Sequence, residues 1–252
     1  MIDANISTVF VGIESPNEES LRETKKFQNV RKGGTSIGRV HTIQNAGLDV
    51  WCGMILGFDN DDNTIFAAQR EYLTEARVLH AMVGMLSAIP KTPLHARLAA
   101  EGRLDEECEA EFGTNVIPAR MSREELRDGY VQLMRELYEP TAYFDRLDDL
   151  FVRGGFRFSQ TRAAYWRRHP WSRLKGNATH LGRSALMYWQ LMQGVPEVEL
   201  RREYRRRIAG FLRTRRDPVA LFVYLLKCVI HYHVHTMVRN MDVRQHRIVN
   251  SF

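Results

Sequence analysis

Cysteine is scarce in this sequence, and its scarcity excludes several classes of protein. The 252 residues include three cysteines, at positions 52, 108 and 228. No CxxC or CxxxCxxC spacing occurs, so the cysteines predict neither a local zinc ribbon nor a cysteine-bound iron–sulfur motif. A sparse, odd count also argues against a disulfide-stabilised secreted domain. We therefore expect reduced thiols in a cytoplasmic protein.

Long apolar runs are lacking as well. The opening residues, Met1-Ile2-Asp3, show neither the basic region nor the apolar segment of a signal peptide. The longest apolar run, 219–230, includes Lys227 and is too short to span a bilayer. Hydrophobic residues at 44% and aromatic residues at 10% nevertheless suffice for a core, which excludes general disorder.

Charge is unevenly distributed along the chain, whose formal net charge is +6. Residues 1–104 carry 11 basic and 12 acidic side chains, residues 105–142 carry 4 and 10, and residues 143–252 carry 21 and 8. A near-neutral front, an acidic connector and a basic tail predict at least two units. We place the domains at 1–104 and 105–252.

The front unit alternates strand and helix patterns. Strands are predicted at 8–14, 49–57 and 79–89, because each is a short apolar run, the first of them rich in β-branched and aromatic residues. Helices are predicted from a Ser15–Glu18 capping box to about residue 27, over 36–46 ending at Gly47, from the acidic residues 59–62 to about residue 77, and over 94–101. This order predicts an α/β fold with a parallel sheet whose chemistry lies at the carboxyl ends of the strands.

The remainder is predicted to be helical. A second capping box, Ser122 to Glu125, opens a helix to residue 139, and further helices are predicted at 196–215 and 218–239. Residues 156–192 carry weaker helical patterns. No strand pattern competes and no repeat period is visible.

The strand ends resemble a known family. The matching segments are Phe10-Val11-Gly12-Ile13-Glu14-Ser15, Ala46-Gly47-Leu48 leading into Gly53-Met54-Ile55-Leu56-Gly57-Phe58, Pro90-Lys91-Thr92-Pro93-Leu94, and Glu101-Gly102-Arg103-Leu104. Together they resemble the second half of a radical S-adenosylmethionine (β/α) barrel, a TIM-barrel-like fold. The resemblance is to its cobalamin-binding members with an all-α C-terminal extension, some of which modify hopanoid lipids. Residues 143–147 resemble the start of that extension less specifically.

The resemblance implies roles for individual residues. Glu14, with Ser15 beside it, would contact the ribose hydroxyls of S-adenosylmethionine, since a carboxylate can accept two hydrogen bonds. Gly53, Ile55 and Gly57 match most of a strand motif in which the apolar residue packs on the adenine and the glycines permit close approach. The family often ends that motif in an acid, whereas Asn60 stands there in this chain, and Lys91 stands where many relatives have glycine. The resemblance also implies that backbone groups of Ala88, Ile89 and Pro90 contact the edge of the adenine.

The family's cluster loop, its amino-group-binding motif and a cobalamin domain are not found in this sequence. Three thiolates must hold the 4Fe–4S cluster, and the scattered cysteines do not replace them. The resemblance therefore implies an N-terminally truncated chain with a partial S-adenosylmethionine site and no catalytic or metal-binding residue of its own. The cluster and cobalamin would belong to the complete protein, an enzyme that methylates or otherwise modifies an unactivated carbon, such as one in a lipid. The missing half would then be a partner of this chain, which the resemblance implies to be inactive alone.

Structural explanations compete with each of these assignments. Glu14 could simply cap the following helix, and acidic residues 59–62 are explained better as a helix cap than as a cation site. His231, His233 and His235 are predicted to pack or to be partly exposed rather than to bind metal, and Met82, Met85 and Leu86 to fill the core. Acidic neighbours should raise the pKa of Cys108, which makes it a poor nucleophile.

The basic tail also supports two readings. Its arginines could form solvated helix faces, or they could bind an anion. Arginines interleaved with aromatic residues, together with the apolar helix at 218–230, favour an anionic membrane surface over nucleic acid. The alternative function is thus a non-catalytic basic helical module that binds an anionic membrane or nucleic acid through residues 143–252. We expect the protein in the cytoplasm or at the periphery of the inner membrane.

Overall fold

A computed structural model describes residues 6–23, 35–157 and 160–241, apart from the side chains of residues 110 and 160–163. It divides into two compact units. One unit comprises 1–9, 40–50 and 138–236, and the other comprises 10–39, 51–137 and 237–252. We call them the helical unit and the sheet unit. The acidic connector thus contributes residues 105–137 to the sheet unit, while the predicted boundary at 104–105 remains a prediction.

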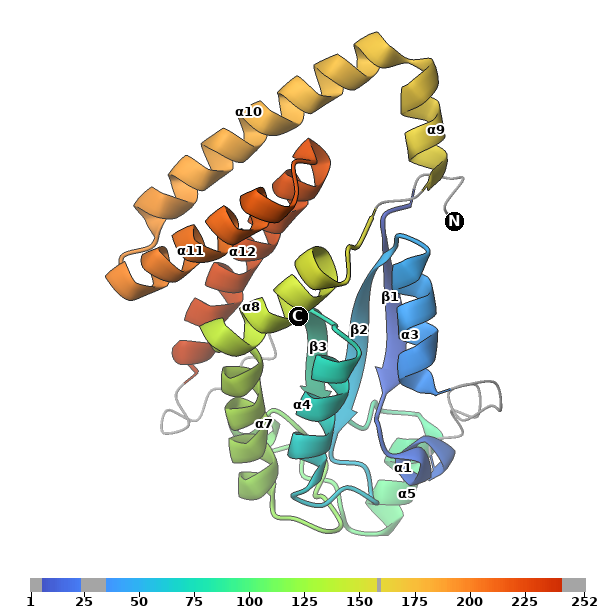
Figure 1. Ribbon diagram of the computed structural model, residues 1–252. Helices are drawn as coiled ribbons and strands as arrows, with labels where there is room; N and C mark the ends of the chain where they lie inside the picture. Colours follow the sequence, from blue (N-terminus) through green and yellow to red (C-terminus); the bar gives the residue numbers. More distant parts are fainter. Residues whose placement is uncertain (1–5, 24–34, 158–159, 242–252) are drawn as a thin grey trace. The chain divides into compact units, whose positions relative to one another are not determined.

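The sheet has three strands in the order β1-β2-β3. They are β1 (Thr8–Glu14), β2 (Asp49–Leu56) and β3 (His80–Met85), and their arrows point the same way in Figure 1. Strands β2 and β3 are parallel, with Gly53 opposite Met82 and Ile55 opposite Gly84. The predicted α/β class and the parallel strands are confirmed. Strand β3 ends at Met85, earlier than predicted.

Alternation along the strands separates a buried face from an open face. Cys52, Met54 and Leu56 of β2 are buried, as are Val83 and Met85 of β3. Their neighbours Phe10 and Met82 are 57% and 38% exposed. One face of the sheet is therefore core, whereas the opposite face is open within this unit. The expectation that Met82 fills the core is wrong, while Met85 and Leu86 are buried as predicted.

Helices of the sheet unit follow the predicted order with shifted boundaries. They are α1 (Glu18–Glu23), α3 (Ser36–Asn45, shared with the other unit), α4 (Ile65–Glu75), α5 (Pro93–Ala100), α6 (Glu109–Phe112) and α7 (Arg123–Leu137). Gly47 follows α3 with φ 89°, the left-handed conformation expected of a helix-ending glycine. The predicted extension of the first helix to residue 27 lies outside the described residues.

Two predicted helix starts have different outcomes. The second capping box is confirmed, because Glu125 N–H donates to Ser122 Oγ at 3.1 Å and Ser122 N–H donates to Glu125 Oε2 at 2.7 Å. The first is wrong. Helix α1 begins at Glu18, and Asn17 caps it by accepting from Glu19 N–H at 2.9 Å. Ser15 Oγ instead accepts from Asn17 N–H in the preceding turn.

The helical unit contains the other long helices. They are α8 (Pro140–Asp148), which continues into the π-helix η1 (Asp149–Arg153), then α9 (Gln160–Arg168), α10 (Pro170–Gly194), α11 (Val198–Thr214) and α12 (Pro218–Arg239). Aromatic residues fill its core: Tyr143, Phe144, Tyr204 and Tyr224 are fully buried. The predicted helix at 218–239 is confirmed at both ends.

Helix α12 is the one helix among the described residues that is long and apolar enough to cross a membrane. A core helix passes the same test, and this helix has core contacts. Lys227 Nζ forms a buried ion pair with Asp49 of the same unit, and Cys228 and His231 are fully buried. Burial lowers the pKa of Lys227, whereas the Asp49 carboxylate raises it. The internal partners of α12 are those of a core helix.

Candidate functional site

A pocket of about 380 Å³ lies on the open face of the sheet. It is lined by Phe10, Gly12, Glu14, Gly53, Met54, Ile55, Met82, Val83 and Gly84. Three of the predicted site residues, Glu14, Gly53 and Ile55, therefore meet at one place. They come from two neighbouring strands, because side chains two residues apart point to the same face of a strand.

Glycine forms part of the pocket wall on each strand. A Cβ atom on Gly84 would meet no atom within 4 Å, so the backbone of β3 is open to the pocket there. A Cβ on Gly53 would lie 3.2 Å from Cζ of Phe10, whose ring therefore packs closely against this glycine. A side chain at position 53 would therefore displace the Phe10 ring by a few tenths of an ångström, whether or not a ligand approaches it.

Glu14 has an unusual backbone. Its φ is 70°, in the left-handed region that non-glycine residues seldom occupy. Its carboxylate folds back over β1, because a Cβ on Gly12 would lie 2.7 Å from Glu14 Oε1. Gly12 is therefore the residue that makes room for this carboxylate. Glu14 is half-buried and its neighbour Ser15 is buried in the turn before α1.

Gly57 does not line the pocket. Its φ is 92°, and a Cβ there would lie 2.9 Å from Leu126 Cδ2 of α7. Its N–H donates to Asp61 Oδ2 at 3.0 Å. Gly57 therefore serves the turn after β2 and the packing of α7, a role that the strand motif did not indicate.

Ala88, Ile89 and Pro90 do not line the pocket either. Ala88 is fully buried, and the side chain of Asn115 forms hydrogen bonds with both polar groups of its backbone. Asn115 Oδ1 accepts from Ala88 N–H at 2.8 Å, and Asn115 Nδ2 donates to Ala88 C=O at 2.9 Å. The Ala88 N–H thus already has a hydrogen-bond partner, which argues against the prediction that it contacts the adenine. Ile89 is 67% exposed, and Pro90 is exposed beside it.

Lys91 adopts a left-handed backbone, with φ 69°. Glycine adopts positive φ without the steric cost that a Cβ brings, so this conformation fits the glycine that the family resemblance implies for many relatives at this position.

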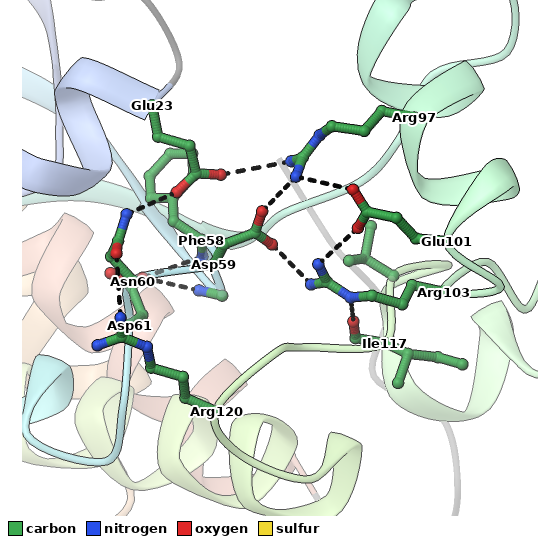
Figure 2. Close-up of polar contacts among 12 residues, drawn as sticks. Glu23, Phe58, Asp59, Asn60, Asp61, Arg97, Glu101, Arg103, Ile117 and Arg120 are labelled. Carbon is green, nitrogen blue, oxygen red and sulfur yellow. Dashed lines mark hydrogen bonds and ion pairs between the residues drawn. The ribbon is translucent and has the colours of Figure 1, made fainter.

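A network of charged side chains lies at the carboxyl end of β2 (Figure 2). Asp59 accepts from Arg97 at 2.5 Å and from Arg103 at 2.6 Å. Glu23 accepts from Arg97 at 3.4 Å and from Asn60 Nδ2 at 3.0 Å. Burial raises the pKa of Glu23, and the nearby Asp59 carboxylate raises it further. Burial also opposes ionisation of Asp59, but the two arginines outweigh it and hold its pKa below the usual value.

The acidic residues 59–62 do not form the predicted helix cap. Asp61 is buried and accepts from Ser20 Oγ at 2.8 Å and from the backbone N–H groups of Gly57 and Phe58. Burial raises its pKa, although these hydrogen bonds lower it. Asp62 accepts from Thr64 N–H ahead of α4. These carboxylates therefore shape the turn after β2.

The cysteines do not form a cluster site. Cys52 and Cys228 are fully buried, and burial raises the pKa of the Cys52 thiol to about 12. The pKa of Cys108 is also raised, chiefly by its interaction with the Asp105 carboxylate, in agreement with the prediction for this thiol. Among the described residues no group of three His, Cys, Asp or Glu side chains could hold a metal ion.

His231 packs in the core, as predicted. Its Nδ1 lies 2.8 Å from Tyr204 Oη, and its Nε2 lies 3.1 Å from the Tyr138 carbonyl oxygen. Since a carbonyl only accepts, Nε2 carries the proton and Nδ1 accepts from the tyrosine. Burial lowers the pKa of His231 to about 3.

Sequence reasoning missed several pocket residues. Phe10, Gly12, Met82 and Gly84 line the pocket but were given no role in it. The signal was present, because each lies two residues from another pocket residue on its own strand. This alternating pattern identifies pocket residues only once the structure shows which face of the sheet is open.

The curated proteins to which the chain is similar include two named methyltransferases and one named methylase. It is 35% identical to an uncharacterized methyltransferase of Synechocystis over 159 residues, which are 62% of this chain and 29% of the relative. It is 26% identical to the hopanoid C-2 methylase of Rhodopseudomonas palustris, over 76% of this chain and 34% of the relative. It is 22% identical to the bacteriochlorophyllide d C-12(1)-methyltransferase of Chlorobaculum tepidum, over 54% of this chain and 30% of the relative.

The chain thus spans about a third of the length of the curated relatives it matches. The methylase of hopanoids among them confirms the resemblance to hopanoid-modifying enzymes. No solved structure matches the chain significantly. Residues 92–247 match a domain of unknown function, from the start of α5 to beyond α12. The chain belongs to this family, DUF4070.

Proposed function

We propose that the open face of the sheet is the nucleoside-binding wall of an S-adenosylmethionine site, in a radical methyltransferase that modifies carbon. The cluster-binding cysteines would come from outside these 252 residues. The observation that carries this proposal is the meeting of Glu14, Gly53 and Ile55 in one pocket, on the face of the sheet that its own unit leaves open.

The open face supports a barrel interior. Parallel sheets are almost always covered on both faces, because their crossover helices and core residues bury them. In this unit the side bearing Cys52 and Met54 is buried, while the side bearing Phe10 and Met82 is exposed. A partial (β/α) barrel, completed by further strands, would enclose this second side and the pocket on it.

The pocket residues fit a nucleoside. The Glu14 carboxylate lies at the end of β1, where it can accept from two vicinal hydroxyls. The open backbone at Gly84 leaves space for a flat ring, and Ile55 supplies an apolar surface opposite it in the sheet. When bound, S-adenosylmethionine supplies a methyl group or an adenosyl radical. The role of this chain's residues is to hold and orient its nucleoside.

The residues present do not fit a 4Fe–4S cluster. Cluster binding needs three thiolates that converge on one point. Two of the three cysteines are fully buried with raised pKa values, and no metal-binding group occurs among the described residues. We therefore assign the cluster and cobalamin to the complete protein and derive no step from them here.

The relatives suggest the substrate class. Two of them are named for methylation of a hopanoid and of a bacteriochlorophyllide. Both names specify a carbon position on a large polycyclic molecule. We propose a substrate of this kind for the complete enzyme, with the reaction taking place in the cytoplasm or at a membrane surface.

Saturation-transfer NMR with the full chain tests the nucleoside site. S-Adenosylhomocysteine should receive saturation from the protein, most strongly at its ribose and adenine protons. Gly84→Val should abolish this transfer while the protein stays folded, because a Cβ at position 84 meets no neighbour within 4 Å. Glu14→Gln should weaken it at the ribose, whereas Glu71→Gln, an exposed position on α4, should leave it unchanged.

Absence of transfer in the unaltered chain would overturn the proposal, as would equal transfer in the folded Gly84→Val variant. Circular dichroism establishes that each variant is folded. Reconstitution with iron and sulfide adds an independent check, because a stable cluster on this chain alone would contradict the assignment of the cluster to other residues.

A further inference from the structure

Helix α10 exposes an apolar stripe along its length. Trp171, Leu174, Leu181 and Trp189 are 82%, 61%, 49% and 60% exposed. Together with the exposed Ala178 and Ala185, they recur every three or four residues, the spacing that keeps side chains on one face of a helix. A single exposed leucine needs no explanation, but a continuous stripe with two tryptophans indicates a surface that contacts a partner or a membrane when the protein functions.

The stripe continues into a groove of the same unit. A cavity of about 350 Å³ lies between α10, α11 and α12, which lie near one another in Figure 1. Leu181, Ala185 and Tyr188 of α10 line one side of it, while Leu212 of α11 and Leu221 of α12 line the other. Ser184 and Leu191 are the buried residues of α10. Of the stripe, Leu181 and Ala185 lie at the groove, whereas Trp171, Leu174, Ala178 and Trp189 do not line it.

The same part of the chain is rich in cations and lacks anions. Residues 150–196 contain eight arginines and lysines and no aspartate or glutamate. Three of these cations, Arg173, Lys175 and Arg183, lie on α10, are exposed, and form no ion pair with a residue that the structure describes. On α11 the situation differs, because Arg202 pairs with Glu199 and Arg206 pairs with Glu203.

An anionic lipid surface matches both properties. Leucine and tryptophan on one face of a helix partition into the boundary between headgroups and acyl chains, and long cationic side chains on its other faces can extend to the phosphates. Nucleic acid would also attract the cations, but a leucine-containing stripe along the helix offers no hydrogen bonds to phosphates or base edges.

We propose that α10 is an interfacial helix, which binds an anionic phospholipid bilayer through its exposed apolar stripe and its cations. The apolar pattern at 218–230 predicts that this segment forms part of the contact. The structure points instead to α10, because Tyr224, Cys228 and His231 bury α12 in the core of the unit. The inference does not depend on the nucleoside site.

Vesicle co-sedimentation of the full chain tests this proposal. The probes are phosphatidylcholine vesicles with and without phosphatidylglycerol. The chain should bind the mixed vesicles, its tryptophan emission should shift to the blue, and added salt should weaken binding. The double variant Trp171→Ser, Trp189→Ser should lose at least about tenfold in affinity, since two large apolar side chains no longer enter the interface.

Charge variants distinguish binding through the cations of α10 from a general attraction of the basic chain to anionic vesicles. Replacing Arg173, Lys175 and Arg183 with Gln should weaken binding by roughly a hundredfold, from a loss of about fivefold per cation. The matched control replaces Arg202 and Arg206, which are paired with glutamates on α11, and should change affinity by less than about threefold.

Three results would overturn the proposal. One is equal binding to the two kinds of vesicle, or none to either. The second is tighter binding to single-stranded RNA than to phosphatidylglycerol vesicles at the same salt concentration. The third is a dimer in analytical ultracentrifugation that the tryptophan variant dissociates, since a second copy would then be what covers the stripe.

Discussion

Protonation of the buried His231 should control the acid stability of the helical unit. In the folded chain burial lowers the pKa of this histidine to about 3, whereas an unfolded chain has a histidine pKa of about 6.5. The unfolded state therefore binds the proton more readily. The contribution of His231 to stability is complete above about pH 6.5 and is lost progressively as the pH falls toward 3.

The size of the effect follows from the two pKa values. Each pKa unit corresponds to about 1.4 kcal/mol, so lowering the pH from 7 to 5 should reduce the free energy of unfolding by about 2 kcal/mol through this group alone. The geometry explains why the proton is excluded. Both ring nitrogens already have partners, and Tyr204 donates to the one that would be protonated.

Urea unfolding at pH 7, 6 and 5 measures this effect. His231→Gln removes the titrating group, so its free energy of unfolding should change about 2 kcal/mol less over this range than that of the unaltered chain. His233→Gln is the matched control on the same helix, because His233 is exposed. Parallel pH curves for the unaltered chain and a folded His231→Gln variant would refute the reasoning.

Three further substitutions test backbone features of the sheet unit by urea unfolding. Gly57→Ala should cost about 3 kcal/mol, from a left-handed backbone and overlap with Leu126; a loss below about 1 kcal/mol would contradict this account. Asn115→Ala should cost about 2–4 kcal/mol, because the buried Ala88 N–H and C=O lose their partner, and an unchanged stability would mean that water replaces it. Lys91→Gly should stabilise by up to about 1 kcal/mol, and clear destabilisation would show that the lysine side chain has a role.

The order of strands and helices could be predicted because it depends on local patterns. Apolar runs predicted all three strands, and the Ser122–Glu125 capping box and Gly47 predicted helix ends from their own chemistry. The start of α1 was missed for a local reason too. Ser15 and Asn17 can both cap, and the chain uses Ser15 for the preceding turn.

The site could be predicted only in part, because its geometry depends on tertiary contacts. Glu14, Gly53 and Ile55 meet because neighbouring strands align, which the alternating pattern implies. Gly57 and Ala88 look identical to ligand-binding residues in the sequence. Their partners, Leu126 and Asn115, lie more than twenty residues away along the chain, and no local pattern indicates those contacts.

The left-handed backbone of Glu14 has a consequence for how this position tolerates change. A glutamate there costs roughly 1–2 kcal/mol of folding free energy that glycine would avoid. In a library of all substitutions at position 14, selection for folding alone should therefore enrich glycine and asparagine over the native residue. Selection for S-adenosylmethionine binding should reverse that order. The difference between the two enrichments would measure how much stability the chain gives up to keep a carboxylate at the end of β1.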